Sequence, residues 1–335
     1  MRPEPPPLPV TLSATNVASG GVEIVEVDAA QSGQRIDNFL TSRVKGVPHS
    51  RLYRALRSGE VRVNKGRIKP SYRLRSGDLV RIPPLRAAQA RTPVRPPEPK
   101  LRHLLSAVLY EDERLLAVNK PSGMAVHGGS GLSWGLIEAM RALRPGDQEL
   151  ELVHRLDRET SGCLLLCKRR STLRELHRLI REKAMDKRYL CLLVGDIPRK
   201  ELRVDAPLRK NLLRSGERVV RVDPAGGKPA CTIFRPLRRL GDFVLAEAEL
   251  LTGRTHQIRV HAAHSGMPVA GDEKYGDEQA NRHLRSLGLK RLFLHASALT
   301  FSPSYREGPL RIEAPLPAEL RKLTEALGRG QCTSS

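Results

Sequence analysis

A proline-rich stretch divides this chain into two parts and so limits what it can fold into. Residues 84–100 read PLRAAQARTPVRPPEPK and contain almost no large apolar side chains. Proline stiffens such a segment, and a segment without apolar side chains cannot contribute to a hydrophobic core. We therefore expect a linker over 84–103 with a module on each side, a flexible N-terminal extension over 1–30 and a tail over 328–335. A length of 335 residues suits two domains.

The module over residues 31–83 carries signals for two short helices and a small sheet. The two helices are marked by apolar stripes, the first formed by Ile36, Phe39 and Leu40 and the second by Leu52 and Leu56. The alternation in VRVNKGRI around Asn64-Lys65-Gly66 predicts a hairpin, and LVRI after Gly77-Asp78 predicts a last strand.

Basic side chains dominate this module. From Arg35 to Arg81 there are 13 Lys and Arg residues and three acidic residues. An ordinary solvated basic surface is the simpler interpretation, but this ratio favours docking on RNA phosphates. The segments GQRIDNFL and SRLYRALRSGEVRVNKGRIKPSYRLRSGD resemble the S4 RNA-binding domain over the whole module. The resemblance implies RNA contacts for the following side chains: Arg51, Arg54, Arg62 and Lys65.

The charge of the whole chain points to the same kind of partner. Lys and Arg total 58 and Asp and Glu total 36, which gives a formal net charge of +22. Such a field attracts polyanions, whereas no long apolar run or lipidation signal supports membrane binding. Aromatic residues make up 4% of the chain, which argues against stacked aromatic platforms as the main mode of RNA binding. Five cysteines without a CxxC pair, and no signal peptide, indicate a reduced, cytoplasmic setting.

The second module, over 104–327, contains more strand signals than helix signals. The runs that predict strands are LLAVNK, GCLLLCK, RYLCLLVGD, ACTIFRPL, FVLAEAEL and RLFLHASAL. The clearest helix signals are STLRELHRLIREKA, HQIRVHAAHSG and PLPAELRKLTEALG. Because strands and helices do not alternate one for one, we expect an α+β fold with a mixed, mainly antiparallel sheet and helices on its flanks.

The densest cluster of reactive side chains is the run VHRLDRETSG at 153–162, which leads directly into an apolar strand. A polar loop entering a buried strand can hold side chains rigidly at a pocket. Arg155 and Arg158 would favour the ionised form of Asp157, which could then act as a nucleophile or a base. A surface cluster of ion pairs is the alternative interpretation of the same residues.

Two further segments could belong to a site. In TGRTHQIRVH, followed by His264, three histidines suggest zinc, but the spacing is not HExxH and RNA or ion-pair contacts are favoured. In NKPSG and VHGGSG the glycines could cradle a phosphate, but neither GKS, GKT nor GxGxxG is present. The sequence therefore predicts no metal and no nucleotide cofactor.

Together these segments resemble the RluA-type family of RNA pseudouridine synthases. VNKPSGMAVHGG is similar to its first motif, HRLDRETSG to its catalytic motif, KRYL to its tyrosine motif, and GRTHQIRVH with AGDEKYG to its third. The motifs occur in the family's order over most of 104–300. The stretches GGSGLSWGLIEAMRALRP and FLHASAL point further, to family members that act on large-subunit (23S) ribosomal RNA.

The resemblance implies a role for each matching residue. Asp157 becomes the catalytic aspartate, Tyr189 the ring that stacks on the target base, and Arg259 the ion-pair partner of Asp157. Arg155 is implied to hold the base that is extruded from the RNA. RNA contact or loop structure is expected for four others: Lys120, His154, Arg254 and His256.

The chemistry of the implied reaction fits what the sequence lacks. Pseudouridine formation breaks the bond from ribose to N1, turns the uracil and rejoins it through C5, so no cofactor is required. A non-catalytic RNA-binding or ribosome-assembly protein is the main alternative, although such a protein would not need an isolated acid facing phosphate. A zinc deaminase would need HxE with PCxxC, and a methyltransferase would need a Gly-rich loop after a strand; neither is present. We expect a monomer that acts on large-subunit ribosomal RNA.

Overall fold

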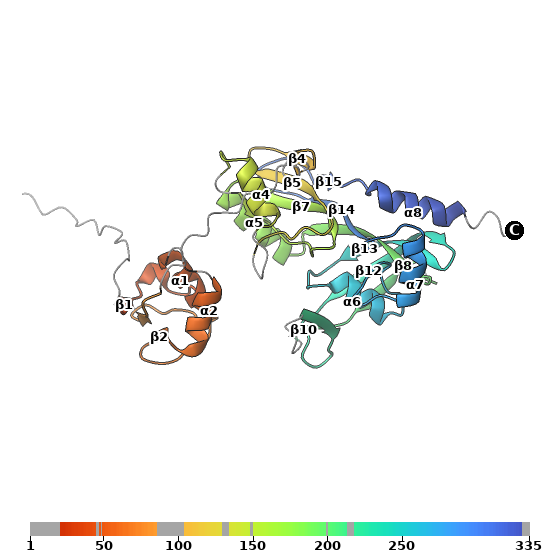
Figure 1. Ribbon diagram of the computed structural model, residues 1–335. Helices are drawn as coiled ribbons and strands as arrows, with labels where there is room; N and C mark the ends of the chain where they lie inside the picture. Colours follow the sequence, from red (N-terminus) through yellow and green to blue (C-terminus); the bar gives the residue numbers. More distant parts are fainter. Residues whose placement is uncertain are drawn as a thin grey trace, which may run out of the picture. The chain divides into compact units, whose positions relative to one another are not determined.

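The computed structural model describes residues 21–44, 47, 49–85, 104–128, 134–147, 150–198, 200–212 and 218–329 (Figure 1). The chain divides into two compact units, Met1–Pro93 and Val94–Ser335. Most of the predicted linker lies outside the described residues. Each unit builds its own hydrophobic core, so each is described separately below.

The N-terminal unit packs two helices against a small antiparallel sheet. Its elements are β1 (Glu23–Glu26), the short 3-10 helix η1 (Ala29–Gln31), α1 (Ile36–Arg43), α2 (His49–Ser58), β2 (Arg62–Val63) and β3 (Leu79–Ile82). Within the described residues the sheet has three strands in the order β1-β3-β2. Both predicted helical stripes are buried in its core, which confirms the two helices: Ile36, Phe39, Leu40, Leu52 and Leu56.

The predicted hairpin around Asn64-Lys65-Gly66 is correct in its turn and wrong in its second strand. Asn64 and Lys65 both have positive φ, 49° and 66°, as a tight two-residue turn requires. After Gly66 the chain leaves the sheet, and β2 pairs with β3 instead. The Asn64 side chain explains this pairing, because it accepts a hydrogen bond from the Leu79 N–H (2.9 Å) and donates one to Asp78 (2.8 Å).

The second unit is built on one large sheet. Within the described residues this sheet has ten strands in the order β4-β5-β7-β14-β8-β13-β12-β9, with β15 beside β14 and β6 beside β7. The strands in chain order are β4 (Val108–Glu111), β5 (Leu115–Lys120), β6 (Glu151–Leu152), β7 (Ser161–Cys167), β8 (Met185–Val194), β9 (Leu202–Asp205), β12 (Cys231–Leu240), β13 (Phe243–Leu250), β14 (Leu294–Phe301) and β15 (Leu310–Glu313). A separate hairpin joins β10 (Leu208–Leu212) and β11 (Arg218–Val222).

Helices flank this sheet on both halves (Figure 1). They are α4 (Leu136–Leu143), α5 (Arg170–Arg181), α6 (Gln257–His264), α7 (Glu278–Ser286) and α8 (Ala318–Arg329). All six predicted strands and all three predicted helices are present, and the sheet is mainly antiparallel, so the predicted α+β fold is confirmed. No helix in the described ranges combines the length and the apolar character needed to cross a membrane.

One parallel pairing joins the two halves of the sheet and fixes the position of the polar loop. β7 runs parallel to β14, with Ser161 opposite His295 and Gly162 opposite Ala296. Gly162 has φ +110°, and a Cβ atom at this position would lie 2.1 Å from the Ala296 carbonyl oxygen. Only glycine fits here. The loop that carries Asp157 therefore leads into β7 at the centre of the sheet, and β14 lies between β7 and β8.

Candidate active site

The loop that carries Asp157 is held by the segment that follows β5. The Lys120 amino group donates to three backbone carbonyl oxygens: those of Pro121 (2.9 Å), Met124 (2.8 Å) and Arg158 (3.0 Å). The Ser122 hydroxyl donates to the carbonyl oxygen of Glu159 at 2.6 Å. These bonds fix the carbonyl groups of the two residues that directly follow Asp157.

For Lys120 the sequence left two alternatives open, RNA contact or loop structure. Its side chain is fully buried, so it cannot contact RNA phosphate, and it holds the loop instead. Burial lowers the pKa of Lys120 to about 7, against the opposing charges of Glu159 and Asp157. Its position at the end of the apolar run LLAVNK could have predicted that Lys120 is buried.

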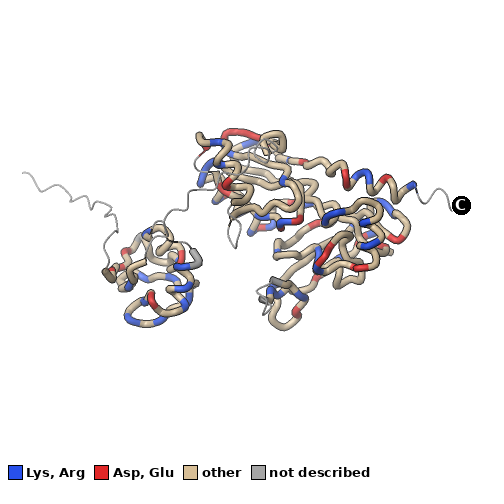
Figure 2. The backbone as a smooth tube through the Cα atoms, in the orientation of Figure 1, with Lys and Arg blue, Asp and Glu red and all other residues tan. Residues whose placement is uncertain are grey.

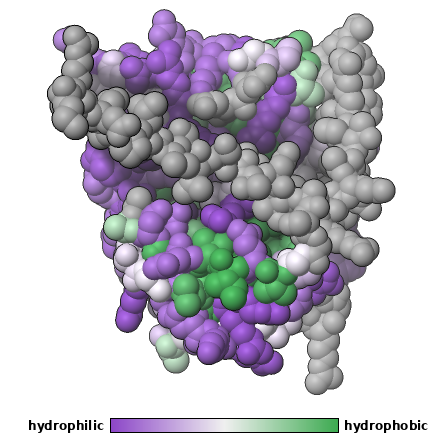
Figure 3. Space-filling model, turned by 90° about the vertical axis from the view of Figure 1, so that its left-hand side faces the viewer, coloured by the Kyte–Doolittle hydropathy of each residue, from purple (hydrophilic) through white to green (hydrophobic). Residues whose placement is uncertain are grey.

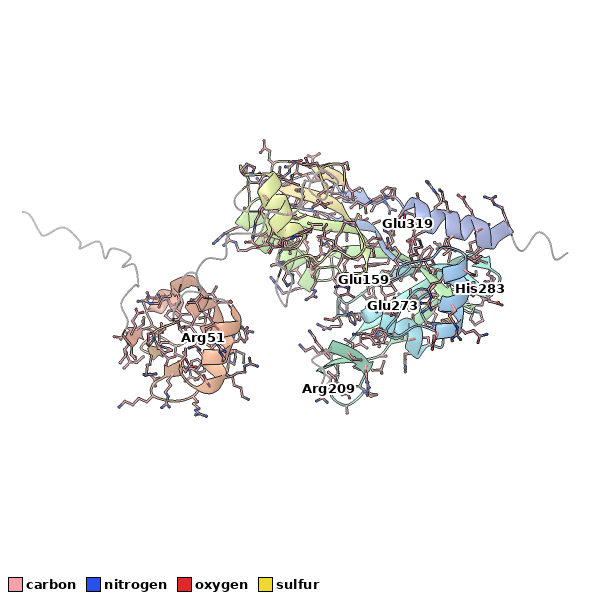
Figure 4. The ribbon with its side chains drawn as sticks, viewed as in Figure 1. Arg51, Glu159, Arg209, Glu273, His283 and Glu319 are labelled. Carbon is pink, nitrogen blue, oxygen red and sulfur yellow. The ribbon has the colours of Figure 1, made fainter. Side chains whose placement is uncertain are left out.

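The far end of the same loop is held by a buried polar chain that the sequence analysis missed. Arg291 donates to the Ser161 hydroxyl (2.6 Å), which lies 2.9 Å from Nδ1 of His295. Nε2 of His295 lies 3.1 Å from the carbonyl oxygen of Ala314, which can only accept. Nε2 therefore carries the proton, and Nδ1 accepts from Ser161. Arg291 also pairs with Glu319 of α8 at 3.3 Å. Figure 4 labels this glutamate.

Asp157 lies between these two anchor points. Its side chain is 19% exposed, and its Oδ2 lies 4.0 Å from Nε2 of His256. Arg158 turns away and pairs with Glu159 at 2.7 Å, whereas Arg155 is exposed beside the site. The carboxylate thus remains open to a substrate while its loop is fixed.

His256 is held in an unusual backbone conformation at the start of α6. Its φ is +53°, in the left-handed region, and its Nδ1 lies 2.9 Å from the hydroxyl of Tyr275. That hydroxyl already accepts the N–H of Val220 at 2.9 Å, so it can donate its own proton to Nδ1. Burial lowers the pKa of His256, although the charge of Asp157 opposes this. A neutral ring with its proton on Nε2 would then point that proton at Asp157.

Arg259 requires a correction. The family resemblance implied Asp157 as its ion-pair partner, but the guanidinium of Arg259 forms a two-pronged pair with Asp272, with both contacts at 2.6 Å. Burial acts to lower the pKa of Arg259, but the bonds and charge of Asp272, together with the charge of Asp157, outweigh it and raise the pKa. Asp272 also accepts the backbone N–H groups of Lys274 and Tyr275. Arg259 therefore acts on Asp157 through space, while it holds the loop of AGDEKYG.

Tyr189 lies in the middle of β8, close to Asp157. It is 7% exposed, and its neighbours across the sheet are Ala248 on β13 and Ala296 on β14, both small. Burial first, and the charge of Asp157 second, raise the pKa of the Tyr189 phenol. The structure therefore brings Asp157 and Tyr189 together although 31 positions separate them in the chain.

Two predicted residues of this unit remain: Arg254, whose side chain is exposed, and His154, whose side chain has a structural role. Arg254 is exposed, and its Nε donates to the Pro229 carbonyl oxygen at 3.1 Å. Nε2 of His154 accepts the N–H of Leu165 at 3.1 Å, so His154 holds the loop rather than contacting RNA. Burial lowers the pKa of His154 to about 4, which keeps the ring neutral.

Lys and Arg occur along much of the N-terminal unit (Figure 2), and most of the predicted RNA contacts there are exposed. Arg54, Arg62 and Lys65 are exposed. Arg62 donates only to backbone carbonyl oxygens. Arg51 differs, because it forms a two-pronged pair with Glu60, with contacts at 3.1 and 2.6 Å. Its charge is therefore partly neutralised.

The three histidines of the second segment do not converge. His261 is buried between the Thr232 hydroxyl and the Ala206 carbonyl oxygen, both at 2.9 Å, and His264 is exposed. Throughout the described part of the chain, no three His, Cys, Asp or Glu side chains are grouped as a metal site would require.

The large sheet thus carries an aspartate loop that leads into β7 and a tyrosine on β8, with β14 between these two strands. The family model described as RNA pseudouridylate synthase matches residues 114–264, and the S4 domain model matches residues 34–80. This chain belongs to the family of RNA pseudouridine synthases. The human protein RNA Pseudouridylate Synthase Domain Containing 4 shares the fold, with a TM-score of 0.57 and 24% identity over 69% of this chain and 95% of that one.

Curated relatives are similar over nearly their whole length. The chain is 53% identical over 309 residues to the ribosomal large subunit pseudouridine synthase C of Salmonella typhi, covering 91% of this chain and 97% of the relative. The protein of the same name from Escherichia coli strain K12 is 52% identical with the same coverage.

Proposed function

We propose that this pseudouridine synthase modifies uridines in large-subunit ribosomal RNA and that Asp157 is its catalytic carboxylate. The target is supported by the names of the relatives that are 52–53% identical over 91% of the chain. The assignment of Asp157 rests on one observation above all. Its carboxylate is partly open to solvent, although its loop is anchored on one side by the buried Lys120 and on the other by the partly buried Arg291.

The neighbouring side chains suit the reaction. Tyr189 offers a buried aromatic face for the uracil, and the exposed Arg155 can hold the base outside the RNA helix. His256 and Arg259 act on Asp157 rather than on the base: the first through an N–H aimed at the carboxylate, the second as a buried positive charge held by Asp272.

The ionised carboxylate starts the reaction either as a nucleophile or as a base, and the bond from ribose to N1 is then broken. The freed uracil must turn so that C5 faces the ribose, which a closed pocket with one aromatic wall permits. Extruding the base costs a few kcal/mol, and phosphate contacts made by exposed Arg and Lys side chains can offset this cost.

RNA binding by the N-terminal unit is part of the proposal. Arg54, Arg62 and Lys65 are exposed and can bind phosphate directly, whereas Arg51 must first exchange its pairing with Glu60. We further propose that the enzyme works as a monomer in the cytoplasm, where its ribosomal substrate is assembled.

The experiment that tests this function maps pseudouridine across total RNA. Cells that lack the protein are complemented with the wild type, with Asp157→Asn or with an empty vector. We expect particular large-subunit positions to lose pseudouridine with the empty vector and with Asp157→Asn, and to regain it with the wild type. Loss confined to other RNAs would contradict the ribosomal target, and full restoration by Asp157→Asn would contradict the catalytic assignment.

A further inference from the structure

A second hollow lies in the same unit, outside the residues assigned above to catalysis. This pocket has a volume of about 790 Å³ and opens between the end of α5, the start of β8 and the loop that follows β13. Much of its lining is apolar: Leu179, Ile180, Met185, Leu250 and Phe301. A volume of this size is within the range of about 300–1,000 Å³ that is typical of small-molecule sites.

The rim of this pocket is lined by basic side chains that form no ion pair with the described residues. Arg181, Lys183, Lys187 and Arg254 line it, and for none of them do the described residues supply a carboxylate oxygen within 4.0 Å. The acidic lining residues are Asp186 and Glu249, and both are paired with Arg188, at 2.8 and 3.1 Å. The pocket therefore combines an apolar lining with a rim of basic side chains that form no ion pair with the described residues.

Lys187 connects the pocket to the catalytic residues. It precedes Tyr189 by two positions on β8, so the two side chains point to the same face of the sheet, about 7 Å apart along the strand. A Cβ atom added to Gly253 would lie 3.8 Å from its Nζ, which puts the amine beside the loop that continues into His256. Its charge also reaches His154 on the Asp157 loop.

The partial burial of Lys187 bears on the kind of ligand that its amino group binds. Loss of solvent lowers the pKa of its amino group, and the charge of Asp186 is the only opposing influence. A half-buried ammonium without a carboxylate partner is costly unless a ligand supplies negative charge.

We propose that this pocket binds the nucleotide next to the target uridine in the substrate strand. Its phosphate lies against Lys187 and Arg254, and its base lies unstacked on the apolar lining formed by α5 and β13. This inference rests on the proposed function, because it takes the target uridine to lie at Asp157 and Tyr189. As a consequence, the enzyme recognises an unpaired nucleotide next to the target uridine as well as the uridine itself.

Photo-crosslinking locates that neighbour. The probe is an RNA fragment around a mapped target uridine, with 4-thiouridine at the adjacent position on the 5′ or the 3′ side, bound to Asp157→Asn. We expect one of the two probes to crosslink within residues 179–187 or 249–254. Crosslinks of both probes confined to other segments would overturn the proposal.

Kinetics provide an independent test. Lys187→Met should raise KM about 5- to 20-fold with little change in kcat, and Lys187→Arg should restore most of the affinity. The matched control is Lys322→Met, an exposed lysine on α8 far along the chain, which should behave as wild type. A thermal unfolding midpoint for each variant separates a folding defect from a binding defect.

Replacing the charged phosphate by a neutral analogue tests the proposed contact between Lys187 and that phosphate. A methylphosphonate at the adjacent position should weaken wild-type binding by the same factor as Lys187→Met, and combining the two should cost no more than either alone. Additive losses, or an unchanged KM for Lys187→Met, would overturn the pocket assignment. Either result would leave the proposed function intact provided that Asp157→Asn is inactive, so the two hypotheses fail separately.

Discussion

Basic side chains play opposite parts in the two units of this chain. In the N-terminal unit Arg54, Arg62 and Lys65 are exposed and bind at most backbone oxygens of their own loops. In the catalytic unit Lys120 and Arg259 are buried, and each holds a loop of the active site through several hydrogen bonds. The N-terminal unit also exposes the apolar residues Val22, Ile24 and Leu79. Figure 3 shows an apolar patch among hydrophilic residues on one face of the molecule.

The difference shows that positive charge in a sequence has two separate physical meanings. An exposed guanidinium lowers the free energy of binding to phosphate and is screened by salt. A buried cation stabilises one loop conformation, and salt hardly screens it. Mutations in the two sets should therefore differ in kind: those in the catalytic unit should lower stability and turnover, and those in the N-terminal unit should change affinity and its salt dependence.

The largest effect on stability is expected for Arg259→Ala. It leaves Asp272 buried without its partner, which should cost about 3–5 kcal/mol of unfolding free energy. Arg259→Lys should recover only part of this, because an ammonium cannot make both planar contacts. Urea unfolding measures the loss, and turnover under saturating RNA measures the effect on Asp157. A variant with normal stability and turnover would contradict a positioning role for Arg259.

Acid should destabilise the catalytic unit through His295. Burial lowers its pKa to about 4, helped by the charge of Arg291 and opposed by the bond to the Ala314 carbonyl oxygen. The unfolded state then binds the proton more readily than the folded state, so stability is complete above about pH 6.5 and falls as the pH drops toward 4. The loss should reach about 3 kcal/mol. In His295→Gln this part of the pH dependence should disappear, and its persistence would assign the effect to other groups.

A smaller loss of stability is expected for Lys120→Met. The three carbonyl oxygens that lose their donor cost free energy, but the variant also avoids burying an ammonium group, so the net loss should be about 2 kcal/mol. Turnover should fall more than RNA affinity does, because Lys120 fixes the peptide of Arg158 beside Asp157. A selective loss of RNA affinity would instead return Lys120 to the set of RNA-binding residues.

Removal of residues 1–92 should leave stability of the catalytic unit almost unchanged and alter RNA binding. The segment from Arg35 to Arg81 contains 13 basic residues, and each lost phosphate contact should lower the slope of log affinity against log salt by roughly 0.7 to 0.9. Binding titrations at several salt concentrations provide the measurement. If the slope does not change, the unit docks on something other than RNA.

Local patterns in the sequence were enough to predict the fold, but not which side chains pair with each other in the site. The stripes of α1, α2 and α8 and the apolar runs of the large sheet report burial directly, so those elements were predicted correctly. The proximity of Asp157 and Tyr189 came from the family resemblance. The partner of Arg259 depends on how the turn at Gly271 brings Asp272 back to α6, which no local period records. The chain from Arg291 through Ser161 to His295 joins segments more than 100 residues apart and was missed for the same reason.

The central claim is that Asp157 carries out the chemistry, while basic side chains bind RNA, hold loops or act on Asp157. The direct test is single-turnover pseudouridine formation by Asp157→Asn on an RNA fragment that contains a mapped target, with Glu159→Gln from the same loop as the control. We predict no product from Asp157→Asn at an RNA affinity close to that of the wild type, and near-normal product from Glu159→Gln. Product from Asp157→Asn at a measurable fraction of the wild-type rate would contradict the account.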